Sequence, residues 1–292
     1  MKSTRKAKVV VVGSLHYDIM VDAPDRPKKG ETVTGYSWHP KFGGKGGNQA
    51  VAAAMADADV SMVGAVGDDD FGRFLLTKLQ AANVDVSRVE RRPGVGSGMS
   101  VAIADSSGDY GAVIVSGANL LVKTEAVEEQ VLWSRAGALV LQNEMAEEIN
   151  IAAARAARKA SVQVCLNAAP YRHLPEALSQ SVDLLIVNAI EAEQLGGLEV
   201  NDLNSARAAA EKLALHYPAV VVTAGGDGVA GCENGKQPIV LEALPVKLIS
   251  THGAGDVFVG TLVSAIASGQ GFEASLRIAN EAAAAHVSTP AN

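Results

Sequence analysis

The chain has 292 residues, 48% of them hydrophobic, and carries a net charge of −7 at pH 7. These values are typical of a globular protein with a large core, and they exclude a disordered chain or a basic nucleic-acid-binding domain. Because the chain is acidic, we expect no nucleic acid as a partner. Because no apolar stretch has the length of a membrane span, we expect no membrane as a partner. Cys165 and Cys232 lie far apart in apolar segments, which predicts buried free thiols and a cytoplasmic location.

Short β-rich apolar runs alternate with alanine-rich helical patterns along most of the chain. The expected strands are 9–12, 60–63, 138–141, 162–166, 184–187 and 220–222. The expected helices lie near 46–57, 71–82, 147–159, 203–216 and 257–268. This alternation predicts an α/β fold with a doubly wound, mostly parallel sheet that helices cover on both faces. No linker or repeat interrupts it, so a single domain over 1–292 is expected.

Two regions break the alternation. Residues 31–38 and 97–116 alternate with period two and contain Gly and Ser turns, which predicts antiparallel strands outside the main sheet. We expect them to form a small β-sheet lid that could exclude water from a reacting phosphate. Residues 228–233 and 237–241 flank Asn234-Gly235, a strong turn signal that predicts a β-hairpin.

The first candidate site residues follow the first expected strand, in the segment 13–18, which carries His16 and Asp18. Ligands of open α/β sheets bind at the carboxyl ends of strands. Asp18 could therefore accept hydrogen bonds from two neighbouring sugar hydroxyls. The alternative is a turn aspartate that bonds its own backbone, and for His16 it is a structural histidine.

A glycine-rich loop, residues 43–48, precedes the first expected helix. It matches neither a Walker A loop nor a dinucleotide fingerprint. Its bare backbone, together with Lys45 and Asn48, could approach and hydrogen-bond a polyhydroxyl ligand. The alternative is a flexible loop that caps a helix. Farther along, Asp68-Asp69-Asp70 fits an acidic first helical turn better than a metal site.

Two further loops follow buried strands in the second half of the chain. Asn188 and Glu191 lie three residues apart and could orient waters around a magnesium–nucleotide phosphate, the alternative being helix capping by Asn188. The glycine-containing loop 223–228 suits phosphate or adenosine contact, and a tight hairpin turn is its alternative.

The segment 251–256 has two glycines and an alanine that lead into Asp256, directly before an apolar helical run. Unpaired N–H groups and the helix dipole favour an anion at such a position. An anion cradle with a base beside it suits phosphoryl transfer, where positioning and charge stabilisation contribute most. The alternative is an Asp cap on a core helix.

In this order the motifs resemble the ribokinase-like (PfkB) family of carbohydrate kinases over nearly the whole chain, and within it the ribokinase branch. The segments that carry the resemblance are 30–35, 42–54, 66–69, 116–119 and 141–144. The resemblance implies transfer of the γ-phosphoryl group of ATP, with Mg²⁺, to a hydroxymethyl group of a small sugar, ribose or a related pentose. The alternatives are a nucleoside kinase of the same fold, which would need an aromatic base slot, and a catalytically weak sugar- or nucleotide-binding regulator.

The resemblance also implies roles for individual residues. Asp256 matches the general base, and Gly253, Ala254 and Gly255 match the anion hole. The implied sugar contacts are His16, Asp18, Gly43, Gly44, Lys45, Asn48, Glu144 and Asp256. The implied nucleotide contacts are Asn188, Thr223, Ala224, Gly225, Asp227, Gly228, Gly255 and Asn280. Asn188 and Glu191 match a water-mediated Mg²⁺ motif, and the lid matches a homodimer clasp.

Departures from the family pattern concern the cation and the sugar. Ser250 stands where the family usually has an Asp that helps to hold an activating monovalent cation, so we expect weak dependence on K⁺ at the site near Ser250 and His252. His16 stands where ribokinases have Asn, which leaves the identity of the sugar open. The family pattern continues through another cation-binding loop and a last helix, whereas this sequence ends at Asn292.

Overall fold

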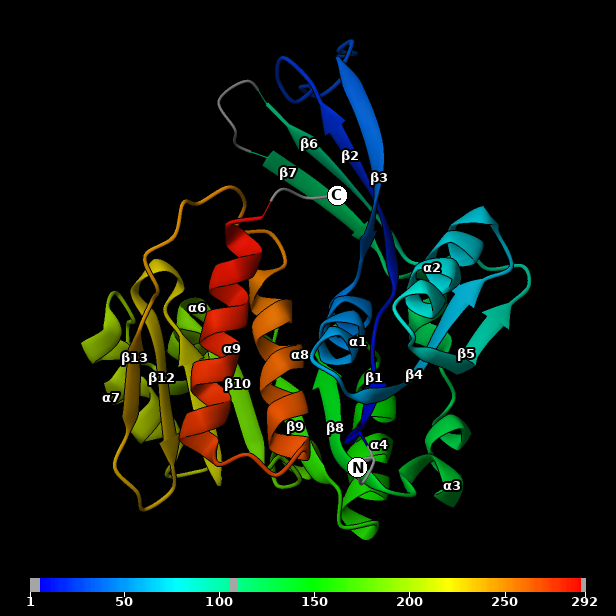
Figure 1. Cartoon of the computed structure of the whole chain (residues 1–292). Coiled ribbons are helices and arrows are strands. Elements are labelled where there is room, and N and C mark those ends of the chain that lie inside the picture. Colours follow the sequence, from blue (N-terminus) through cyan, green and yellow to red (C-terminus); the bar gives the residue numbers. More distant parts are fainter. Residues whose placement is uncertain (1–5, 106–109, 290–292) are drawn as a thin grey trace, which may run out of the picture.

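A computed structural model describes residues 6–105 and 110–289 (Figure 1). Its main sheet has nine strands in the order β13-β12-β11-β10-β9-β8-β1-β4-β5. The strands are β1 (Lys8–Val12), β4 (Asp59–Gly67), β5 (Asp85–Arg92), β8 (Ala136–Gln142), β9 (Gln163–Asn167), β10 (Leu184–Asn188), β11 (Ala219–Thr223), β12 (Gly228–Glu233) and β13 (Ile239–Glu242). Neighbours pair in parallel from β11 to β5, and β12 runs antiparallel to β11 and β13. The predicted mostly parallel sheet is thus confirmed.

Helices cover both faces of this sheet, as the alternation of elements predicts. On one face lie α1 (Lys45–Met55), α2 (Asp70–Ala81), α8 (Ala254–Ala267) and α9 (Phe272–Val287). The other face carries α3 (Gln130–Trp133), α4 (Glu147–Lys159), α5 (Glu176–Ser179), α6 (Ala189–Gly196) and α7 (Leu203–Leu213). Val9 and Val11 of β1 pack in the core beneath α1 and α8, and Val10 and Val12 pack in the core on the opposite face, beneath α4. Successive strand side chains point to opposite faces of a sheet.

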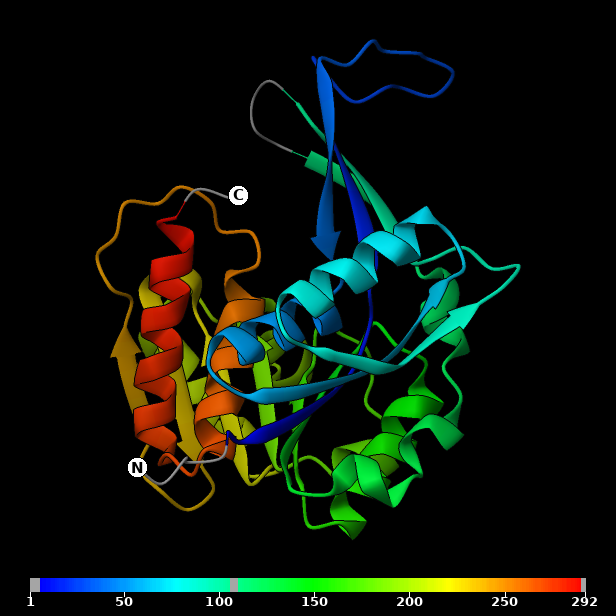
Figure 2. The same ribbon diagram turned by 45° about the vertical axis from the view of Figure 1, so that its right-hand side comes forward.

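Helices α1 and α8 lie side by side on their face of the sheet (Figures 1 and 2). Gly260 permits this close contact, since a Cβ there would lie 2.6 Å from the Ala52 Cβ and 2.6 Å from the Gln49 carbonyl oxygen. The contact brings the amino-terminal ends of the two helices together. In the part of the chain that the structure describes, no helix is both long and apolar enough to cross a membrane.

A second, four-stranded sheet projects from the α/β body (Figure 2). It has the order β3-β2-β6-β7 and comprises β2 (His16–Asp22), β3 (Ser37–Gly43), β6 (Met99–Ala104) and β7 (Tyr110–Val115). β2 pairs in parallel with β6 and antiparallel with β3, and β7 is antiparallel to β6. This sheet is the lid that the period-two pattern predicts.

The expected lid segments need correction in detail. Residues 31–36 form no strand, because β2 pairs residue for residue with 37–43 and its ladder ends before them. His16 and Asp18, which the sequence placed in the segment after the first strand, lie in β2, an inner strand of this sheet. The expected range 97–116 contains both β6 and β7, and its residues 106–109 lie outside the described part of the chain. The hairpin at Asn234-Gly235 is confirmed as β12 and β13.

Candidate active site

The carboxyl ends of several parallel strands and the amino-terminal end of α8 surround a cavity of about 150 Å³. This edge of the sheet is where open α/β folds bind their ligands. Its lining includes many residues that the sequence singled out, although they lie far apart in the chain. Those that line it are Lys45, Asn188, Glu191, Thr223, Gly253, Gly255 and Asp256, joined by Asn167, Ala169, Ile186, Val187 and Val259.

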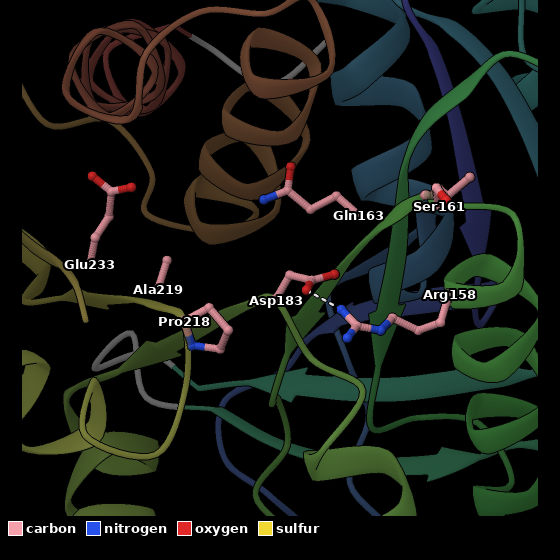
Figure 3. Close-up of a pocket in the computed structure, with 8 residues that line it drawn as sticks. Arg158, Ser161, Gln163, Asp183, Pro218, Ala219 and Glu233 are labelled. Carbon is pink, nitrogen blue, oxygen red and sulfur yellow. Dashed lines mark hydrogen bonds and ion pairs between the residues drawn. The ribbon is translucent and has the colours of Figure 1, made fainter. Parts of the chain in front are cut away.

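A larger cavity, of about 580 Å³, lies at the opposite edge of the sheet (Figure 3). Arg158 and Asp183 form an ion pair in its wall, and Glu233 lies on another side of it. This cavity is at the amino ends of β9 to β11 and contains none of the predicted site residues. The smaller cavity is therefore the candidate active site.

Asp256 lies in the first turn of α8 and is held by two amides from α1. Its Oδ2 accepts a hydrogen bond from Asn48 Nδ2 at 3.0 Å, and its Oδ1 accepts one from Gln49 Nε2 at 2.9 Å. Burial raises the pKa of Asp256, while Lys45 and the two amides favour the charged form. A carboxyl group with a raised pKa in a cleft is suited to accept a proton near neutral pH.

The turn before Asp256 leaves room for an anion. Gly253 caps α8 with φ 82°, a left-handed conformation that favours glycine. A Cβ on Gly255 would meet no atom within 4 Å, so the space in front of its backbone is open. The first N–H groups of a helix have no partner within the helix and carry partial positive charge. The Ala254 N–H donates to the Thr251 carbonyl oxygen at 3.2 Å, so the backbone of Gly253 and Gly255 forms the cradle beside the carboxylate.

Asp18 lies on the lid, in β2, rather than in a turn. Asp18 is 9% exposed, and its carboxylate accepts a hydrogen bond from Ser100 on the neighbouring strand β6. Lys41 of β3 stands opposite Asp18 on the other side. Burial raises the pKa of Asp18, although the bond from Ser100 opposes the rise. A Cβ on Gly43 would lie 1.9 Å from Asp18 Oδ2, so Gly43 has to be glycine for Asp18 to keep this position.

His16 begins the same lid strand and is 4% exposed. Its Nε2 has no hydrogen-bond partner among the residues that the structure describes. A buried polar atom normally has a partner, so this nitrogen lacks the hydrogen bond that its burial calls for. The structural role that the sequence left open for His16 is not visible in its hydrogen bonds.

Glu144 connects the loop after β8 to the start of α1. Its Oε2 accepts a hydrogen bond from the Lys45 backbone N–H at 2.9 Å and another from Ser14 Oγ. Gly44 precedes α1 with φ 86°, and a Cβ there would lie 2.7 Å from the Ser14 carbonyl oxygen. These contacts fix Lys45 between the lid and the cradle at Asp256.

Asn188 and Glu191 form the amino-terminal cap of α6. Asn188 Oδ1 accepts from the Glu191 N–H at 2.9 Å, and Glu191 Oε2 accepts from the Asn188 N–H at 3.0 Å. The capping alternative is therefore what the structure contains, and both side chains also line the cavity. Burial raises the pKa of Glu191. Glu191 and Asp256 are the two acidic residues among those that line the cavity.

Three of the expected nucleotide contacts, Asn188, Thr223 and Gly255, line the cavity, and the others do not. Thr223 ends β11 and lines the cavity, while Ala224, Gly225 and Asp227 form the following short turn. Gly228 starts β12 with φ 127° and completes the turn. Asn280 does not line the cavity, because its Nδ2 donates to the Glu242 carbonyl oxygen at 2.8 Å and ties α9 to β13.

Ser250 and His252 lie in the loop before α8. Ser250 Oγ accepts a weak hydrogen bond from the His252 backbone N–H at 3.3 Å. Burial lowers the pKa of His252, and the positive charge of Lys41 lowers it further. Over residues 6–105 and 110–289, no group of three His, Cys, Asp or Glu side chains is placed to hold a metal ion.

Sequence reasoning missed Gln49 and Asn167, which lie beside Asp256. Gln49 is fully buried, and its Nε2 also donates to Asn167 Oδ1 at 3.0 Å. Two signals in the sequence could have found them. Gln49 is a long polar residue in an otherwise alanine-rich helix, and Asn167 is a polar residue at the carboxyl end of a buried strand.

A family model described as "pfkB family carbohydrate kinase" matches residues 6–291. The chain belongs to this family. This carbohydrate kinase is 34% identical to the ribokinase of Bacillus subtilis over 280 residues, which cover 96% of this chain and 92% of the relative. It is 31% identical to the deoxyribokinase of Salmonella typhi over 255 residues, 86% of this chain and 83% of that one.

A solved structure of ribokinase from Arabidopsis thaliana, complexed with ribose and ATP, superposes with a TM-score of 0.91. The superposition covers 98% of this chain and 94% of that chain at 30% sequence identity. This similarity includes both sheets, so the predicted α/β fold with its β lid is confirmed for this carbohydrate kinase.

Proposed function

We propose that this carbohydrate kinase transfers the γ-phosphoryl group of ATP to the hydroxymethyl group of ribose or a closely related pentose. The observation that carries the proposal is the position of Asp256 beside the open cradle of Gly253 to Gly255. The base and the anion site lie next to each other there, as phosphoryl transfer to a hydroxyl requires. The similarity to ribokinases supports the choice of a pentose.

In the proposed reaction, Asp256 accepts the proton of the attacking hydroxyl. Asp18 and Asn48 hold the other hydroxyls of the sugar, and Gly43, Gly44 and Glu144 shape the floor beneath it. The N–H groups at the start of α8 and Lys45 stabilise the negative charge on the transferring phosphoryl group. Thr223 and the turn 224–228 hold the nucleotide, with Asn280 keeping α9 and β13 together at its outer side.

The sugar can be identified with a phosphorylation screen. Ribose, 2-deoxyribose, other pentoses, hexoses and nucleosides are each supplied with ATP, and ADP release is measured. We expect the highest kcat/KM with ribose or 2-deoxyribose, because the chain is 34% identical to a ribokinase and 31% identical to a deoxyribokinase. A preference for nucleosides would overturn the proposal and favour the nucleoside-kinase alternative.

Magnesium fits this site as a partner of the nucleotide. Mg²⁺ keeps several waters and uses one or two carboxylates together with substrate phosphates, and Glu191 offers one such carboxylate in the cavity wall. When bound, the ion neutralises charge on the phosphates. Asn188 and Glu191 would hold its waters, and their mutual cap fixes both side chains.

We expect Glu191→Gln to raise the Mg²⁺ concentration needed for half-maximal activity about 10-fold, the usual size of an outer-shell effect. Glutamine can still accept from the Asn188 N–H, so the cap of α6 should survive. The measurement is kcat against free Mg²⁺ at saturating ATP, with thermal unfolding as a check of folding. Glu193→Gln, on the exposed side of the same helix, is the matched control. An unchanged Mg²⁺ dependence in Glu191→Gln would contradict the assignment.

We expect little activation by K⁺, because Ser250 provides a neutral hydroxyl where the family usually provides a carboxylate. Ser250→Asp should restore a charge and lower the half-saturating K⁺ concentration about fivefold, the effect of roughly 1 kcal/mol of attraction. The test titrates both forms with KCl, using tetramethylammonium chloride to hold the ionic strength. Saturable activation of the wild-type protein at low K⁺ would show that Ser250 does not weaken K⁺ binding.

We further propose that the lid mediates a homodimer. Ile19, Val101 and Val113 stand opposite one another across β2, β6 and β7, so they share one face of the sheet. Asp18 and Ser100 lie on the other face. On the apolar face Trp38 is 62% exposed and Val113 is 68% exposed. A contiguous exposed apolar face is typical of an interaction surface, and a second copy of the lid would cover it.

Val113→Asp should therefore weaken self-association at least about 10-fold, because two like charges would meet across a symmetric interface. Sedimentation equilibrium measures the dissociation constant. Val240→Asp places the same change on β13, where Val240 is 41% exposed, and should leave association unchanged. A wild-type protein that is monomeric in this measurement would refute the dimer.

Both cysteines are buried free thiols, which supports the proposed cytoplasmic location.

A further inference from the structure

Three buried amide side chains form a continuous hydrogen-bonded chain beneath the candidate active site. Gln142 Nε2 donates to Gln49 Oε1 at 2.8 Å, and Gln49 Nε2 donates both to Asn167 Oδ1 at 3.0 Å and to Asp256 Oδ1 at 2.9 Å. The residues come from the carboxyl ends of β8 and β9 and from α1. Gln142 and Gln49 are 0% exposed. Polar side chains at this depth are costly unless they are well bonded.

A backbone carbonyl group at one end determines which amide donates and which accepts along this series of hydrogen bonds. Asn167 Nδ2 donates to the Ile186 carbonyl oxygen at 3.2 Å, and a carbonyl oxygen can only accept. Asn167 must therefore turn its Oδ1 toward Gln49, and Gln49 must present its NH₂ group to Asn167 and Asp256. The Oε1 of Gln49 then faces the NH₂ group of Gln142. If the Gln49 amide were flipped, its Oε1 would face the acceptor oxygens of Asn167 and Asp256. Its NH₂ group would face the NH₂ group of Gln142.

The other donor to Asp256 is differently placed. Asn48 lines the proposed sugar site, so a bound sugar hydroxyl can compete for its amide. Gln49 is fully enclosed and bonded at both ends of its amide, so no ligand can reach it. Gln49 is therefore the donor to Asp256 that persists when a sugar binds.

We propose that Gln49 is a positioning residue for the catalytic base: it holds Oδ1 of Asp256 in one orientation and keeps the carboxylate charged. This inference rests on the proposed function, in which Asp256 accepts the proton of the sugar hydroxyl. The charged groups that act on the Asp256 carboxyl are Lys45, at the start of α1, and Glu144, after β8, and Glu191 lines the same cavity. Lys45 favours the carboxylate and Glu144 opposes it, and Gln49 supplies a neutral donor between them.

The test compares two variants of Gln49. Gln49→Met keeps the length of the side chain and removes the N–H donor, and Gln49→Glu keeps its shape and adds a carboxyl group. The first readout is the titration of the Asp256 carboxyl carbon by ¹³C NMR, assigned with Asp256→Asn. The pKa of Asp256 should rise in both variants, by about 1 unit or more in Gln49→Glu, where two carboxyl groups share one site.

The second readout is turnover with the sugar that the screen identifies. We expect kcat to fall about 10- to 100-fold, the usual cost of a misplaced catalytic group, while the sugar KM changes less than about threefold. The acid limb of the kcat profile should move to higher pH. Asn150→Ala is the matched control, because Asn150 is buried and bonds the Gln142 carbonyl oxygen at 2.8 Å without touching Asp256. It should lower thermal stability and leave the titration and the acid limb unchanged.

The outcomes separate the two hypotheses. An Asp256 titration that is the same in the unchanged protein and in both Gln49 variants would overturn the positioning role, whatever the turnover. A shifted titration without turnover of any sugar would support the role of Gln49 and refute the proposed function. If Gln49→Met does not fold, Gln49→Glu decides, because it keeps an acceptor for Gln142 Nε2.

Discussion

Replacing Asp256 by asparagine should lower kcat by about two to four orders of magnitude, the usual contribution of a general base. An amide of nearly the same shape cannot accept the proton of the attacking hydroxyl. The cradle at Gly253 to Gly255 and the sugar contacts of Asp18 remain, so sugar affinity should change little. The measurements are steady-state kcat with ribose and ATP, and ribose binding by calorimetry.

The pH dependence gives an independent check. Burial raises the pKa of Asp256, so kcat should rise with pH through a midpoint above that of an ordinary aspartate, since only the carboxylate accepts a proton. This acid limb should disappear in Asp256→Asn. Asp202→Asn is the matched control, because Asp202 caps α7 at the surface and asparagine caps equally well. Full activity in Asp256→Asn would rule out its role as the base.

Gly43→Ala should lower kcat/KM for the sugar about 100-fold and leave the KM for ATP unchanged. The new methyl group would occupy the position of the Asp18 carboxylate, which lies 1.9 Å from the ideal Cβ. Asp18 would have to swing away and lose its bonds to the sugar. Loss of one or two charge-assisted hydrogen bonds, each worth about 1.5–3 kcal/mol, accounts for the size of the effect.

A Gly-to-Ala change elsewhere provides the control for Gly43→Ala. A Cβ on Gly271, before α9, would meet no atom within 4 Å, so Gly271→Ala should leave kcat/KM unchanged. Thermal unfolding of both variants distinguishes a local effect from a loss of the fold. A kcat/KM for Gly43→Ala within about threefold of the unchanged protein would show that Asp18 does not bind the sugar.

The main sheet could be predicted because its strands are apolar on both faces and its helices have a clear period. β1 is buried along nearly its whole length, so a short apolar run identifies it. The lid could be predicted only as a region. Residues 31–36 have the alternation of a strand but lie beyond the ladder, whereas 16–22 pair on both sides. Pairing between distant segments decides such cases, and no local pattern contains that information.

The site was predictable where small residues or loops carry the chemistry. Gly253, Gly255, Asp256 and Lys45 lie in loops or at the starts of helices, and all four line the cavity. Gln49 was missed, because a long polar residue in an alanine-rich helix indicates that it has a partner but does not identify it, and the partner lies more than two hundred positions away. Glu191 shows the opposite difficulty, since one short segment serves both as a helix cap and as a cavity wall.

Residues 13–15 join β1 of the main sheet directly to β2 of the lid. Under the proposed function, His16 and Asp18, which meet the sugar, therefore belong to the lid, whereas Asp256 and its cradle belong to the α/β body. Sugar recognition is thus divided between the two units, since Asn48 contributes from α1 of the body, whereas the base and its cradle lie in the body alone. Mutations in the lid strands can therefore change which sugar is accepted and leave Asp256 and its cradle unaltered. One fold can in this way acquire new substrates and keep the same reaction.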